Sequence, residues 1–157
     1  MSVTLAQAST IVDVALAKGR ETNCAPLTVA VLDAGGHLVA FKREDRSGIL
    51  RYDIAYGKAW GALGMGFGSR ELAERAAKNP VFIGALTTIA QGRLVPGPGG
   101  VLIKDAGGAV LIIVPSPLSG EGCEKLSTYT DGRGVPLSHS SLLKLRSSPL
   151  PQGERAR

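Results

Sequence analysis

The tetrapeptide Asp33-Ala34-Gly35-Gly36 occurs a second time in this chain, at residues 105–108. Each copy stands between apolar stretches, and these cover residues 27–32, 37–41, 101–104 and 109–114. Glycine accepts the positive φ of a tight turn and aspartate bonds its own backbone, so Asp and Gly between such stretches indicate a β-hairpin. The sequence therefore predicts two hairpins built from these four strands.

Four helices are predicted around the hairpins, over residues 5–18, 51–63, 69–78 and 80–90. Thr4 and Gln7 form a capping-box pattern at the start of the first helix, and Asn79 is placed to cap the last one, with Pro80 at its first position. The second helix is rich in glycine, and each interior glycine costs about 0.5–1 kcal/mol relative to alanine. We therefore expect it to fray early or to pack very closely on another segment.

The composition restricts the classes of protein to which the chain can belong. Its 157 residues, 44% of them hydrophobic, predict one globular domain. The net charge of +5 is not gathered into a basic run and aromatic residues make up only 4%, so no nucleic-acid partner is expected. Neither a membrane helix nor a signal peptide is evident, which predicts a cytoplasmic protein without a membrane partner. Two cysteines form no disulfide framework.

The regular alternation of apolar stretches and turns ends at Pro115. Residues 115–157 are rich in Ser, Pro and Gly, and their only apolar cluster is Leu142, Leu143 and Leu145. Such a segment buries too little apolar surface to offset the entropy lost on ordering. We therefore expect a folded domain over residues 1–114 and a disordered tail over residues 115–157.

The first 114 residues resemble the GlcG/HbpS family, also called the haem-degrading or DUF336 family, whose module also ends the PduO-type adenosyltransferases. The resemblance rests on DAGGHLVAF at 33–41 with Arg43 and Asp45, on IAYGKA at 54–59, and on PGGV at 98–101. It implies an α/β (α+β) fold of profilin-like type, in which helices flank an antiparallel sheet. It also implies a homo-oligomer, and haem as the ligand of some members. Other members are encoded with genes of glycolate or diol metabolism.

The chain departs from the family pattern at two places. Gly61 stands where the family usually has threonine. From residue 111 onward, the sequence LIIVPSP replaces the family's glycine-rich closing strand and helix. We therefore expect the disordered tail to take the place of that strand and helix. An out-of-frame read-through would produce such an ending, and the chain would then be a non-functional remnant.

Six residues are candidates for ligand binding: His37, Arg43, Asp45, Lys58, Gly99 and Gly100. His37 is either a ligand of haem iron or an exposed histidine at the start of a strand. Arg43 and Lys58, with Asp45 beside them at one pocket mouth, suit a propionate or a small carboxylate, although the same charges also suit surface ion pairs. The loop around Gly99 and Gly100 offers backbone N–H groups to an anion.

Residues that would identify an enzyme are not evident. The family-like region holds no set of nucleophile, base and orienting group and no second histidine, so no catalytic residue is assigned. Two hypotheses follow. The first is a haem-binding or haem-handling protein that holds the macrocycle in an apolar cleft. The second is a non-catalytic accessory protein of a metabolic operon, which binds a small carboxylate.

Overall fold

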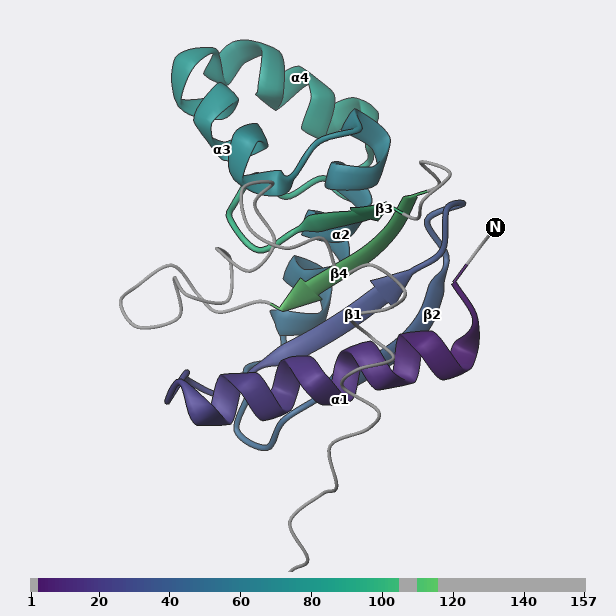
Figure 1. Cartoon of the computed structure of the whole chain (residues 1–157). Helices are drawn as coiled ribbons and strands as arrows, with labels where there is room; N and C mark the ends of the chain where they lie inside the picture. The colour runs from purple at the N-terminus through teal and green to yellow at the C-terminus, as the bar shows by residue number, and fades with distance from the viewer. Residues whose placement is uncertain (1–2, 105–109, 116–157) are drawn as a thin grey trace, which may run out of the picture.

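The computed structural model describes residues 3–104 and 110–115 (Figure 1). Within this part of the chain lie the helices α1 (Leu5–Glu21), α2 (Arg51–Met65), α3 (Ser69–Lys78) and α4 (Pro80–Ile89), and the strands β1 (Thr28–Leu32), β2 (Leu38–Arg43), β3 (Val101–Lys104) and β4 (Val110–Pro115). All eight elements were predicted from the sequence, and each boundary lies within three residues of its predicted position. The mixed α/β class is thus confirmed.

The four strands form one antiparallel sheet in the order β2-β1-β4-β3. In the first hairpin, the carboxylate of Asp33 accepts hydrogen bonds from the backbone N–H groups of Gly35 and His37, and Gly36 adopts a φ of 80°. The turn therefore forms as the Asp-Gly pattern predicts. In the second hairpin, β3 and β4 pair as expected, while their turn lies outside the described residues.

Helices cover both faces of the sheet, with α1 on one side and α2 on the other (Figure 1). Val29 and Val31 of β1 pack with α1, and the alternate residues Ala30 and Leu32 pack with α2. Every residue of β1 is consequently buried. This two-sided burial explains why the sequence of β1 is a continuous apolar run without polar alternation.

Helices α3 and α4 form a separate layer at the end of the molecule away from α1 (Figure 1). Their contact is a cluster of Leu72, Ile83, Ala90 and Leu94, of which Leu94 belongs to the loop that leads to β3. The side chain of Asn79 accepts from the backbone N–H of Phe82, so it caps α4 as expected. The α3–α4 pair carries the chain from the end of α2 back to the sheet.

The glycine-rich helix α2 packs closely on another segment, which is one of the two outcomes predicted for it. A Cβ atom on Gly57 would lie 2.6 Å from Val95 Cγ2, and one on Gly61 would lie 3.2 Å from Leu94 Cγ. The helix continues to Met65, two residues beyond the predicted end, and stops at Gly66 with a φ of 75°. Because Gly57 and Gly61 have no side chains, the loop that precedes β3 can approach α2 closely.

Three further expectations concern the C-terminal tail, the cysteines and a membrane helix. The disordered tail and the lost closing helix lie outside the described residues, although Pro115 itself is the last residue of β4. The sequence analysis found no disulfide framework, and the structure adds that Cys24 is disulfide-bonded. No described helix is long and apolar enough to cross a membrane.

Candidate functional site

His37 lies in the turn between β1 and β2, with 81% of its side chain exposed. Its Nδ1 atom lies 3.2 Å from Asp33 Oδ1. The hydrogen bond from the backbone of His37 is the largest cause that lowers the pKa of Asp33 below its usual 3.8, so Asp33 is ionised at neutral pH. A carboxylate on one ring nitrogen orients an imidazole, and the Nε2 atom of His37 has no partner among the described residues.

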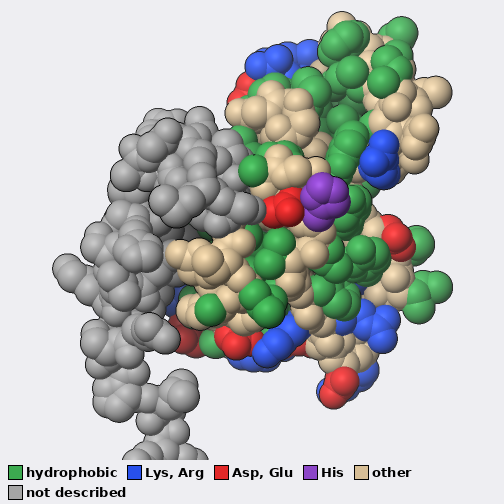
Figure 2. All heavy atoms as spheres, turned by 90° about the vertical axis from the view of Figure 1, so that its right-hand side faces the viewer, with side chains coloured by type: hydrophobic (Ala, Val, Ile, Leu, Met, Phe, Trp, Pro, Cys, Tyr) green, Lys and Arg blue, Asp and Glu red, His purple; other side chains and the backbone are tan. Residues whose placement is uncertain are grey.

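The turn that carries His37 packs against an aromatic side chain of α2. A Cβ atom on Gly36 would lie 3.0 Å from the Trp60 ring and 3.6 Å from Leu63, and the guanidinium of Arg93 lies 4.5 Å from the centre of that ring. Figure 2 shows the histidine of the described chain among hydrophobic side chains, with a carboxylate next to it. We call His37, Trp60, Leu63 and Arg93 the hairpin face.

Arg43 is the last residue of β2, at the end away from His37, and Asp45 follows two residues later. A strand rises about 3.3 Å per residue, so Arg43 is about 20 Å from His37 along β2. The two residues line a cavity of about 430 Å³ together with Arg20, Pro26, Glu44 and Arg46. His37 and Arg43 therefore belong to different places on the surface.

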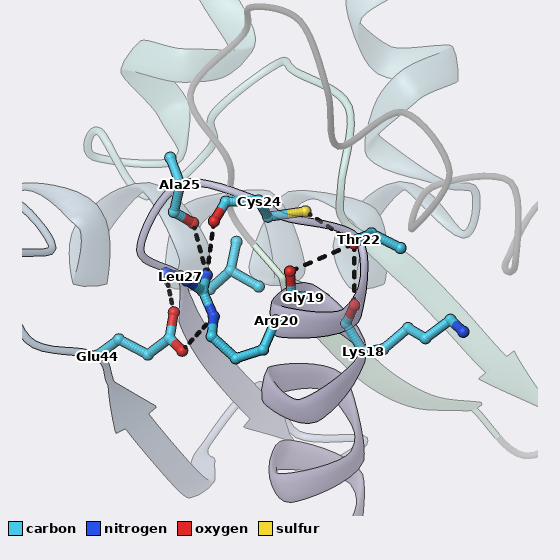
Figure 3. Close-up of polar contacts among 8 residues, drawn as sticks. All are labelled: Lys18, Gly19, Arg20, Thr22, Cys24, Ala25, Leu27 and Glu44. Atoms are coloured by element: carbon cyan, nitrogen blue, oxygen red, sulfur yellow. Dashed lines mark hydrogen bonds and ion pairs between the residues drawn. The ribbon is translucent and has the colours of Figure 1, made fainter.

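Two charged side chains of this cavity are fixed by hydrogen bonds to the chain (Figure 3). Arg20 donates to the carbonyl oxygens of Cys24 and Ala25 and pairs with Glu44 at 2.9 Å. The second carboxylate oxygen of Glu44 accepts from the backbone N–H of Leu27. In contrast, Arg43 and Arg46 have no polar partner among the described residues. The cavity consequently presents two guanidinium groups that make no ion pair with a described residue, with the carboxylate of Asp45 on the same lining.

Lys58 is buried on α2, beneath the loop 97–100, with only 6% of its surface exposed. A Cβ atom on Gly97 would lie 3.1 Å from Lys58 Cε, and one on Gly100 would lie 2.6 Å from the carbonyl oxygen of Lys58. Gly99 has a φ of 119°, which favours glycine. The structure thus brings Lys58, Gly99 and Gly100 together. It does not bring Lys58 to the cavity of Arg43 and Asp45, because the loop covers its side chain.

Ser69 holds this loop in place and was missed in the sequence, where it served only to mark the start of α3. Its hydroxyl donates to the carbonyl oxygen of Gly97 and accepts from the N–H of Gly100 at 2.6 Å, and its own N–H donates to the carbonyl of Gly100. No signal in the sequence links Ser69 to a segment thirty residues away. Trp60, Arg93, Arg20 and Arg46 were also missed, since only the fold places them beside the predicted residues.

No group of three or more His, Cys, Asp or Glu side chains in the described ranges could hold a metal ion. His37 is the single histidine of the described ranges, so one imidazole at most is available there to a metal ion. Apart from the carboxylate of Asp45, the remaining candidate groups are cationic side chains and backbone N–H groups, which suit anions.

Comparison with known proteins places the chain in a family. Residues 3–122 match the family model described as haem degrading protein HbpS-like. No curated protein sequence matches the chain significantly. The family match thus covers both hairpins and all four helices.

Several solved structures have a similar fold. The Klebsiella pneumoniae protein ORFY, a DUF336 protein, has a TM-score of 0.71 and 23% identity, with 82% of this chain and 87% of that chain covered. PduOC in complex with haem has a TM-score of 0.66 and 20% identity, with 78% and 86% covered. HbpS has a TM-score of 0.66 and 23% identity, with 82% and 85% covered. At these identities the likeness shows a shared fold.

Proposed function

Because this chain belongs to the family of HbpS-like haem degrading proteins, we propose that it binds haem and that His37 is the axial ligand of the iron. The observation that carries the proposal is the geometry of His37, whose ring is oriented by the ionised Asp33 and is 81% exposed, with hydrophobic side chains nearby (Figure 2). A haem complex among the structural neighbours supports the choice of ligand.

The hairpin face offers the three kinds of group that haem requires. An imidazole suits the iron, and the carboxylate of Asp33 keeps the imidazole in one orientation. Trp60 and Leu63 supply apolar contact for the macrocycle. Arg93, which stacks on Trp60, supplies a cation for a propionate. Arg43 is too far from His37 for the propionate role that the sequence suggested, so we assign that role to Arg93.

Hemin titration tests this assignment. We expect hemin to give a shifted Soret band with the unchanged protein, and His37→Ala to lose that shift and weaken the binding more than about tenfold, because even an outer-shell partner contributes that much. Arg93→Gln should weaken binding severalfold. Arg75→Gln is the matched control, since Arg75 of α3 also stacks on an aromatic ring, that of Phe67 at 4.3 Å, but is not part of the hairpin face. An unchanged spectrum and affinity in His37→Ala would rule out the ligand assignment.

A second candidate function is the binding of a small carboxylate by an accessory protein, favoured by the unpaired Arg43 and Arg46 in the cavity of about 430 Å³. A ligand present at a hundredfold excess over its Kd stabilises the fold by about 2.7 kcal/mol. We therefore expect glycolate or a related acid to raise the melting temperature by several degrees, and Arg43→Gln to abolish the rise. Lys78→Gln, which removes an exposed charge from α3, should retain it. A rise that persists in Arg43→Gln would contradict this function.

A further inference from the structure

We propose that Lys58 and the loop 97–100 above it form a binding site for the carboxylate group of a small monovalent acid. The observation behind this is that the ammonium group of Lys58 is buried and has no hydrogen-bonding or ionic partner among the described residues. The site is separate from the hairpin face and from the cavity of Arg43, so it does not rest on haem binding.

The burial of Lys58 is exceptional within this protein. Lys58 is the only charged residue of the described chain in the buried class, where its companions are the hydroxyl residues Thr28, Ser47 and Ser69. Proteins bury a charge when it is paired, because an unpaired one loses its hydration without compensation. A buried polar group without a partner calls for an explanation, and an ion or ligand that completes it is the explanation we argue for Lys58.

The electrostatic surroundings of Lys58 favour an anion. Burial is the main cause that lowers the pKa of Lys58, and the like charge of Arg51, two turns earlier on α2, lowers it further. No described carboxylate acts on Lys58 from α2, α3 or the loop. A bound anion would oppose both effects, so its binding is expected to be coupled to the uptake of a proton by Lys58.

The loop supplies the rest of the site. The backbone N–H groups of Gly97 and Gly99 have no acceptor among the described residues, and Gly99 is buried. A Cβ atom on Gly97 would lie 3.6 Å from Lys58 Nζ, so the missing side chain leaves that approach to the ammonium group open. Ser69 holds both ends of the loop by hydrogen bonds to Gly97 and Gly100.

This donor set fits a carboxylate better than a larger oxyanion. One ammonium group and two amides can satisfy the two oxygens of a carboxylate, one on Nζ and one on the loop. They provide a single positive charge, which balances a monovalent anion and leaves the second charge of a phosphate uncompensated. Formate and acetate are therefore the probes to use.

The test follows the amide NMR signals of Gly97 and Gly99 while acetate or formate is added to the full chain. We expect saturable shifts at both glycines, an affinity that falls as the pH rises through the pKa of Lys58, and no comparable response to inorganic phosphate. Lys58→Met should weaken the binding at least about tenfold, since it removes a charge-assisted hydrogen bond. Lys78→Met, an exposed lysine on α3, is the matched control and should bind normally.

A second variant keeps the test decisive if Lys58→Met does not fold. Gly97→Ala places a methyl group beside Lys58 Nζ and should block the shift at Gly99. Hemin binding should stay unchanged in Lys58→Met, which separates this site from the hairpin face. The proposal is overturned if acetate and formate cause no shift at the two glycines, if the shifts persist in Lys58→Met and Gly97→Ala, or if phosphate binds more tightly.

Discussion

Gly100→Ala should destabilise the fold by about 3 kcal/mol, because the added methyl group meets atoms that cannot move aside. A Cβ atom at this position would lie 2.6 Å from the carbonyl oxygen of Lys58 and 2.6 Å from Ser69 Oγ. To make room, the loop would have to leave α2 and break the hydrogen bonds that Ser69 makes with Gly97 and Gly100. Urea unfolding followed by circular dichroism measures the loss.

Gly64→Ala is the matched control for this experiment. Gly64 lies on α2 itself, where it is exposed and nothing lies within 4 Å of its Cβ position. Alanine there should stabilise the protein by about 0.5–1 kcal/mol, because it removes the entropic cost of an interior glycine. The two substitutions add the same methyl group and are expected to have opposite signs. Equal effects at the two positions would show that the loop does not rest on α2.

Glu44→Ala is expected to cost about 2–3 kcal/mol, because Glu44 ties together three segments of the chain (Figure 3). One carboxylate oxygen accepts from the N–H of Leu27, a fully buried residue, and the other pairs with Arg20 at 2.9 Å. Without the carboxylate, the N–H of Leu27 is left without an acceptor at the start of β1. Chemical denaturation gives the free energy directly.

Glu44→Gln separates the hydrogen bond to Leu27 from the ion pair with Arg20. The amide oxygen can still accept from the N–H of Leu27, while the charge that pairs with Arg20 is gone. Its loss should be about half that of Glu44→Ala. Glu74→Ala, an exposed glutamate on α3, should change the stability by less than about 0.5 kcal/mol. If Glu44→Ala and Glu74→Ala behave alike, the hydrogen bond to Leu27 does not contribute to the stability.

The local structure could be predicted from the sequence, because each sequence signal lies within a few residues of the turn or helix end that it determines. The Asp33 turn, the Thr4 capping box and the Asn79 cap are short-range hydrogen-bonding patterns, and all three occur as predicted. The strand boundaries follow from apolar runs in the same way. The homo-oligomer implied by the resemblance stays a prediction.

The composition of the sites could not be predicted, because it depends on contacts between distant segments. The sequence analysis grouped Arg43 with Lys58 by charge. In the structure, Arg43 lines a cavity, whereas the loop 97–100 covers Lys58. Residue type alone does not tell which charge will be buried. Ser69 shows the same limit, since its partners are Gly97 and Gly100. Arg43 and Asp45 were expected to lie together and do line one cavity, because they are close in the sequence. The contact of His37 with Asp33 is equally local, but the sequence analysis missed it.

The strand order β2-β1-β4-β3 also has a consequence for the way the chain folds. Each hairpin forms from neighbouring residues, but the pairing that joins them sets Ala30 against Val114, about 84 positions later. Closing so long a loop adds little to the equilibrium cost, yet it slows folding, because the entropy is lost before the contact is gained. We therefore expect the first hairpin and α1 to form early during synthesis. One edge of β1 then stays unpaired until β4 has left the ribosome.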